Sequence, residues 1–63
     1  MSTIEITKEA FKSIVNDEQQ SFKYNKVLEL CEETHFFAMG VNLFTIFNFV
    51  SNTKQYYIID INA

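Results

Sequence analysis

The most apolar run in the chain is Val41-Asn42-Leu43-Phe44-Thr45-Ile46-Phe47-Asn48-Phe49-Val50. Its β-branched and aromatic residues favour a β-strand. A strand on the half-exposed surface of a sheet alternates between apolar and polar residues, whereas this run is apolar at both its odd and its even positions. We therefore expect a strand that needs cover on both of its faces.

The length of the chain predicts one domain spanning residues 1–63. Hydrophobic residues make up 48% of the sequence, which is typical of a folded protein rather than a disordered one. A domain of this size buries only about 60% of the surface of its unfolded chain, so we expect low stability.

The charge of the chain argues against several classes of partner. The net charge is −3, and all five basic residues are Lys, so the sequence has no Arg for bidentate contacts with phosphate or guanine. We therefore expect no direct binding of nucleic acid and no affinity for an anionic membrane.

The cysteine content and the first residues bear on the compartment. A single Cys cannot form an internal disulfide, which fits a reducing cytosol. The first residues lack the basic and apolar regions of a signal peptide. We expect a cytoplasmic protein, in the host cytoplasm if a phage encodes it.

The first third of the chain predicts a strand followed by a helix. Polar and apolar residues alternate over Thr3–Ile6, which favours a short strand. Thr7 has the position of a helix N-cap, and Ile6 and Phe11 have the spacing of a hydrophobic staple. We expect a helix from about Lys8 to Asn16 and a polar connection over residues 16–21.

The segment from Phe22 to Met39 fits two periodicities. For a helix, one apolar face is formed by Tyr24, Val27, Leu28, Cys31 and His35. For a strand, one face is formed by Phe22, Tyr24, Leu28 and Leu30, with Lys26 interrupting it. The helix accounts for more residues, and Gly40 can terminate it, so we expect a helix over residues 22–34.

The end of the chain predicts a hairpin and completes the fold class. A polar loop over residues 51–54 separates the strand 41–50 from a second strand, Gln55–Ile61. The predicted fold is α+β, with the order strand, helix, helix, strand, strand. We expect a three-stranded, mostly antiparallel sheet with the helices on one face.

Counting the apolar residues on each face of this hairpin predicts a binding surface. We assign the more apolar, odd-numbered set to the helices: Leu43, Phe47, Phe49, Tyr57, Ile59 and Ile61. The even-numbered set remains on the other face: Phe44, Ile46, Val50, Tyr56 and Ile58. An apolar patch of this kind on a soluble protein usually marks an interface, with a larger protein or with a second copy. The alternative is that one helix covers each face, or that Phe36 and Phe37 fold across.

Few residues suggest catalysis or metal binding. Cys31 and His35 would share a helix face, but a structural zinc site needs further Cys or His ligands that the sequence lacks, so we expect a buried Cys and a boundary His. Glu29, Glu32 and Glu33 predict a hydrated acidic face that could dock a basic partner. We expect no enzyme activity, cofactor or metal.

These observations favour a small acidic protein-binding module that occupies a surface of a larger protein, pairs with a second copy as a homodimer, or does both. The abundance of Asn, Ile, Lys, Phe and Tyr is typical of AT-rich phage or mobile-element genes. An inhibitor of a host defence nuclease or polymerase would fit. The alternatives are a winged-helix-like nucleic-acid binder, whose element order is the same, and a small enzyme or metal protein that uses Cys31 and His35.

Overall fold

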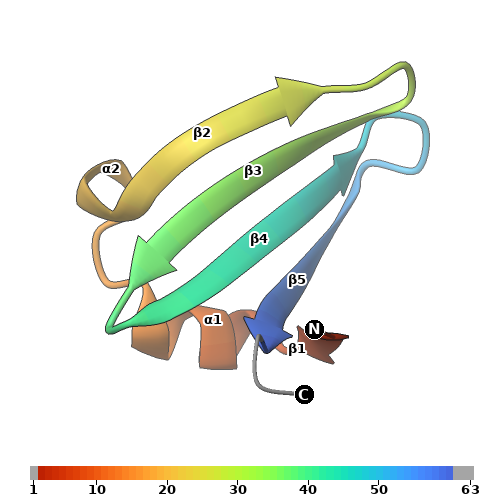
Figure 1. The fold of residues 1–63 in the computed structure, drawn as a ribbon. Helices are drawn as coiled ribbons and strands as arrows, with labels where there is room; N and C mark the ends of the chain where they lie inside the picture. The colour runs from red at the N-terminus through yellow and green to blue at the C-terminus, as the bar shows by residue number, and fades with distance from the viewer. Residues whose placement is uncertain (1, 61–63) are drawn as a thin grey trace.

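Residues 2–60, which the computed structural model describes, form a five-stranded antiparallel sheet with two short helices (Figure 1). The elements are β1 (Ser2–Ile6), α1 (Lys8–Ile14), α2 (Glu18–Ser21), β2 (Phe22–Val27), β3 (Cys31–Ala38), β4 (Val41–Asn48) and β5 (Thr53–Asp60). The strand order is β1-β5-β4-β3-β2, which places the most apolar strand, β4, at the centre.

The predicted three-stranded sheet is wrong, because the segment predicted as a helix over residues 22–34 forms strands. β2 and β3 are joined by the three residues 28–30, and β3 pairs with β4 from Cys31 opposite Asn48 to Ala38 opposite Val41. This pairing satisfies the backbone N–H and C=O groups along one edge of β4. A helix over residues 22–34 would have left that edge unpaired, so sheet pairing overrides the helical periodicity.

Gly40 therefore belongs to a hairpin turn and does not terminate a helix. The turn between β3 and β4 consists of Met39 and Gly40, whose φ angles are 53° and 73°. Two-residue hairpins favour turns in which both central residues have positive φ, because the twist of such turns matches that of the strands. Gly adopts this conformation freely, whereas Met adopts it at a cost.

The N-terminal predictions are largely confirmed. A strand covers Ser2–Ile6, and the Thr7 hydroxyl accepts a hydrogen bond from the Ala10 N–H at 3.1 Å, as expected of an N-cap. Helix α1 ends at Ile14, two residues before the predicted end. The predicted connection contains the single turn α2, whose first N–H groups are capped by the Asp17 carboxylate.

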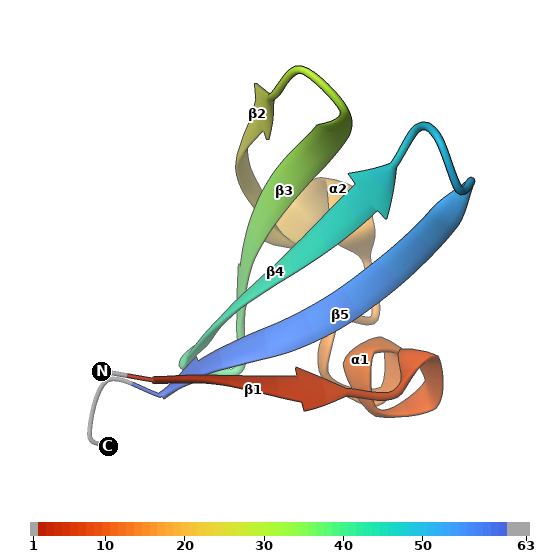
Figure 2. The same cartoon turned by 90° about the vertical axis from the view of Figure 1, so that its right-hand side faces the viewer.

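Both helices lie on the same side of the sheet (Figure 2). The fully buried core consists of Phe11 and Val15, from α1 and its end, with Phe36 of β3 and Leu43 of β4. The Phe11 ring meets the Phe36 ring edge-on at 5.2 Å and the Tyr56 ring at 5.0 Å. The core therefore lies under α1, near the end of the sheet where β4 begins.

The predicted hairpin of β4 and β5 is present, but its loop is Phe49–Asn52 instead of residues 51–54. The Asn48 side-chain oxygen accepts hydrogen bonds from the Val50 and Ser51 N–H groups at 2.9 and 3.0 Å, which ends β4 early. Ile61, the predicted end of the last strand, lies outside the described residues.

The predicted assignment of the hairpin to faces is confirmed for β4, whose odd-numbered Leu43 packs in the core, and is wrong for β5, whose Tyr57 and Ile59 face away from the helices. A loop with an even number of residues pairs odd positions of one strand with even positions of the other. Leu43 accordingly lies opposite Ile58, and Phe44 lies opposite Tyr57. Residues directly opposite each other share a face, so the even-numbered residues of β4 and β5 point to opposite sides of the sheet.

The turn between β3 and β4 gives a test of the fold. We expect Met39→Asn to stabilise the protein by up to about 1 kcal/mol, because Asn tolerates positive φ better than Met. We expect Gly40→Ala to destabilise it by about 1 kcal/mol, although an added Cβ meets no atom within 4 Å, because the strain is confined to the backbone. Urea denaturation followed by circular dichroism measures both changes; equal midpoints for all three proteins would contradict the assigned turn.

Candidate protein-binding surfaces

The structure divides the residues predicted to bind a partner among three places. Phe44, Ile46 and Glu33 share the face of the sheet that faces away from both helices, which we call the open face. Val50 and Glu29 lie in two loops, residues 49–52 and residues 28–30, at the end of the sheet where β4 ends. Tyr56, Ile58 and Glu32 lie on the face that carries the helices.

Tyr56 and Ile58 are part of the protein's own core. Both are partly buried and pack against the cluster of Phe11, Phe36 and Leu43. The prediction that they share a face with Phe44 and Ile46 is wrong. Because the loop has four residues, even positions of β5 lie opposite odd positions of β4.

A row of four aromatic rings crosses the open face. Tyr24, His35, Phe44 and Tyr57 come from β2, β3, β4 and β5 and lie opposite one another in register. Successive ring centroids are 4.5, 5.4 and 4.8 Å apart, and successive ring planes are inclined by 13°, 24° and 15°. These distances match the spacing of neighbouring strands, so each ring stacks on the ring of the next strand.

This stacking limits what the row can bind. Single-stranded nucleic acids bind to sheets when bases stack on the faces of aromatic rings. The inner ring faces of this row are already occupied by neighbouring rings, which leaves mainly ring edges for a ligand. The row therefore offers apolar edges to another surface of side chains better than it offers platforms to bases.

His35 is fixed within the row by Glu33. The His35 Nε2–H donates to Glu33 Oε1 at 2.7 Å, since an ionised carboxylate can only accept. Cys31 lies on the same strand and the same face, four residues away, which corresponds to about 13 Å in a strand. The helix that would have brought Cys31 and His35 together does not exist, so the two side chains do not form a catalytic or metal-binding pair. Cys31 is also partly exposed, where we expected a buried Cys.

A second surface is formed by the two loops at the far end of the sheet. Its exposed apolar side chains are Val27, Leu28, Leu30, Phe49 and Val50, which we call the apolar tip. The most exposed are Val50 at 76%, Val27 at 66% and Leu30 at 58%. Folded chains rarely leave such a group in water unless it contacts another molecule.

Hydrogen bonds hold the apolar tip in a defined shape. The Phe49 N–H donates to the Leu30 carbonyl at 3.0 Å, which joins the two loops to each other (Figure 1). Within the loops, the Leu28 N–H donates to the Cys31 carbonyl and the Asn52 N–H donates to the Asn48 carbonyl. The Phe47 and Phe49 rings meet edge-on, with their centroids 5.7 Å apart. A partner would therefore meet side chains whose backbone is already ordered.

The predicted acidic cluster does not form one face. Glu29 lies in the loop of the apolar tip, Glu32 accepts a hydrogen bond from the Asn25 side chain at 2.8 Å on the face that carries the helices, and Glu33 lies on the open face. Glu29 and Glu32 nevertheless lie close in sequence to the apolar tip and give its margin a negative charge.

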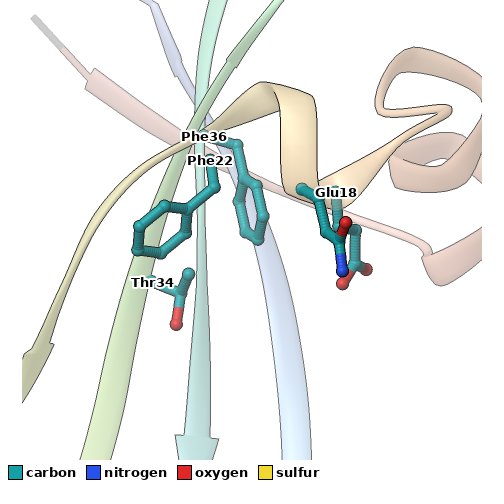
Figure 3. A pocket seen from close by; sticks show the side chains of 5 residues that line it. Glu18, Phe22, Thr34 and Phe36 are labelled. Carbon is teal, nitrogen blue, oxygen red and sulfur yellow. The ribbon is translucent and has the colours of Figure 1, made fainter.

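A shallow pocket of about 360 Å³ lies between α2 and the strands β2 and β3 (Figure 3). Phe22, Thr34 and Phe36 line it from the sheet, and Glu18 and Gln19 line it from α2. The Phe22 and Phe36 rings meet edge-on at 6.4 Å. The pocket therefore has an apolar floor of two Phe rings and a polar margin from Thr34 and α2.

Sequence reasoning missed most of the apolar tip and the two members of the aromatic row on β2 and β3, Tyr24 and His35. Leu30 was the one residue that did not fit the predicted helix, and Phe49 was assigned to the strand. The signal available was the apolar flanks of two polar turns, Leu28-Glu29-Leu30 and Phe49-Val50-Ser51. The two segments form one surface because the folded chain places their loops side by side.

Comparison with protein-family models, with curated proteins and with solved structures gives no match to this chain. Across residues 2–60, neither helix has the length and apolar character needed to cross a membrane. Within the same residues, no three His, Cys, Asp or Glu side chains gather as metal ligands would. The class of protein therefore has to be inferred from the two exposed apolar surfaces.

The division of the sheet into two faces can be tested with a matched pair of isoleucines. We expect Ile58→Asp to destabilise the domain by about 3 kcal/mol or more, because the carboxylate would replace a side chain that packs on the core. We expect Ile46→Asp, on the open face, to cost about 1 kcal/mol. Urea denaturation of both variants at low protein concentration measures the difference. Equal losses would contradict the assignment of the two residues to opposite faces.

Proposed function

We propose that this chain is a non-catalytic protein-binding domain that contacts a larger protein through its apolar tip. The observation that carries the proposal is the exposure of five large apolar side chains, four on two loops that are hydrogen-bonded to each other and Val27 at the end of β2. Preordered apolar anchors lower the entropy cost of association, so a small surface of this kind can bind usefully.

The charge beside the apolar tip indicates the chemistry of the partner. Glu29 and Glu32 lie within and next to the loop that carries Leu28 and Leu30. An apolar cleft with Lys or Arg at its margin would complement this arrangement and would also attract the acidic chain as a whole. Such a domain acts by occupying a surface of its target, as an inhibitor or a subunit does. A single free Cys fits a partner in the reducing cytoplasm.

The proposal predicts that one substitution at the apolar tip removes binding without unfolding the domain. We expect Val50→Asp to weaken binding to the target at least tenfold, because Val50 is 76% exposed and the new carboxylate would enter an apolar contact. Met39→Asp is the matched control: Met39 is 77% exposed and lies in the turn at the opposite end of β4.

The experiment uses quantitative mass spectrometry of proteins captured by the wild type and by each variant, followed by calorimetry with the purified target. A target retained by Met39→Asp and lost by Val50→Asp supports the proposal. A target that binds Val50→Asp as well as the wild type would show that the apolar tip is not the binding surface.

The winged-helix alternative is not retained, because residues 22–34 lie in β2, β3 and the loop between them, and α2 is a single turn of four residues, too short to enter a nucleic-acid groove as a recognition helix. The aromatic row still allows a direct check of nucleic-acid binding. We expect no retardation of single-stranded DNA or RNA at low salt, since the chain carries net charge −3 and the rings stack on each other. Retardation that falls steeply with added salt would contradict the proposed function.

A further inference from the structure

The open face carries an apolar area that neither helix of residues 2–60 covers. Both helices pack on the opposite face, so the aromatic row, Ile46, Ile59 and the half-exposed Phe37 are left to each other and to water. The five strands contain 35 residues, and at about 4.8 Å per strand and about 3.3 Å per residue they present about 550 Å². Two such faces together would bury about 1,100 Å², which exceeds the area of about 1,000 Å² expected of a specific protein interface.

The charges on the open face point to a second copy of the chain as its occupant. The charged residues there are Lys23 and Lys26 of β2, Glu33 of β3 and Glu5 of β1. They are two positive and two negative charges, so this face is neutral although the whole chain carries −3. Two copies can therefore meet through this face without the repulsion that their other surfaces would produce.

The same charges select how the two copies are arranged. The positive residues lie on β2 at one edge of the sheet, and Glu5 lies on β1 at the other edge. A two-fold axis that runs between the sheets and parallel to the strands places β2 of one copy over β1 of the other. A two-fold axis across the strands would place β2 over β2, and Lys over Lys.

We propose that the chain forms a symmetric dimer in which the open faces pack together about an axis parallel to β4. In this arrangement the aromatic row of one copy lies over the row of the other, and the two rows run in opposite directions from β2 to β5. Each Phe44 therefore lies over its counterpart. Glu5 of each copy lies over β2 of the other, near Tyr24 and between Lys23 and Lys26. The contact of Glu5 with β2 occurs twice because the interface is self-complementary, whereas the contact between the two Phe44 rings lies on the axis and occurs once.

The first test measures the oligomeric state of the purified chain by sedimentation velocity from 1 to 500 µM, a range of about 500-fold that brackets dissociation constants typical of interfaces of this size. We expect the wild type to pass from monomer to dimer and Ile46→Asp to remain a monomer throughout. Val50→Asp is the control, because it adds the same charge at the apolar tip and should dimerise as the wild type does.

The outcomes of this first test are distinct. A wild type that stays monomeric at 500 µM, or that forms polymers which keep growing with concentration, would overturn the dimer. Loss of the dimer in Val50→Asp together with its retention in Ile46→Asp would move self-association to the apolar tip and would also overturn it. Because the measurement needs no target, its result is independent of the proposed function.

The second test examines the arrangement by exchanging charges. Glu5 and Lys26 lie four strand spacings apart within one copy, about 19 Å, which exceeds the Debye length of about 8 Å at 0.15 M salt. We expect Glu5→Lys and Lys26→Glu each to raise the dissociation constant of the dimer about tenfold, since each reversal acts at two symmetric contacts.

The double variant Glu5→Lys, Lys26→Glu restores the opposite charges across the interface and should return the constant to within about twofold of the wild type. Circular dichroism of the three variants confirms that the fold is unchanged. A double variant that dimerises as weakly as the two single effects multiplied together would exclude the placement of β2 over β1.

Discussion

Phe11 packs against Phe36 and Tyr56 over the buried Leu43, and the extent of this contact determines how much of the sheet is covered. Helix α1 has only seven residues, and α2 has only four. Together they cover one end of one face of a sheet whose central strand is apolar on both sides. The covered end is the core of the domain, and the two remaining apolar regions, the open face and the apolar tip, are what the chain has available for contacts with other molecules.

Local signals in the sequence were sufficient for the elements whose causes are local. Thr7 as an N-cap, the short strand before it and the hairpin of β4 and β5 each depend on neighbouring residues, and each is present. The segment 22–38 could not be assigned in this way, because Tyr24, Leu28, Cys31 and His35 satisfy a helical period while the segment pairs as strands. The deciding factor was the edge of β4, which follows the segment directly after the turn Met39–Gly40 and pairs with β3 along its whole length, a contact that the periodicity of residues 22–38 alone does not show.

The candidate surfaces show the same limit. The imbalance between apolar residues and the cover that two helices can give was visible in the sequence, and Phe44 and Ile46 were placed away from the helices from that imbalance alone. The sequence also predicts Tyr56 and Ile58 on that face. The four-residue loop, however, pairs odd positions of β4 with even positions of β5, so these two side chains face the helices. Phe49 and Leu30 became neighbours only through the hydrogen bond that joins their loops, which depends on three-dimensional geometry.

The pairing of β1 with β5 sets an order for folding. Ser2 lies opposite Asp60 and Ile6 lies opposite Tyr56, so the first of the five strands pairs with the last. The hairpins formed by β2 to β5 connect neighbours in sequence and can close early, whereas β1 closes a loop that includes almost the entire chain. Until then Ile4 and Ile6 have no strand beside them. The interval before β1 pairs with β5 is therefore when a folding chain of this topology is most exposed to aggregation.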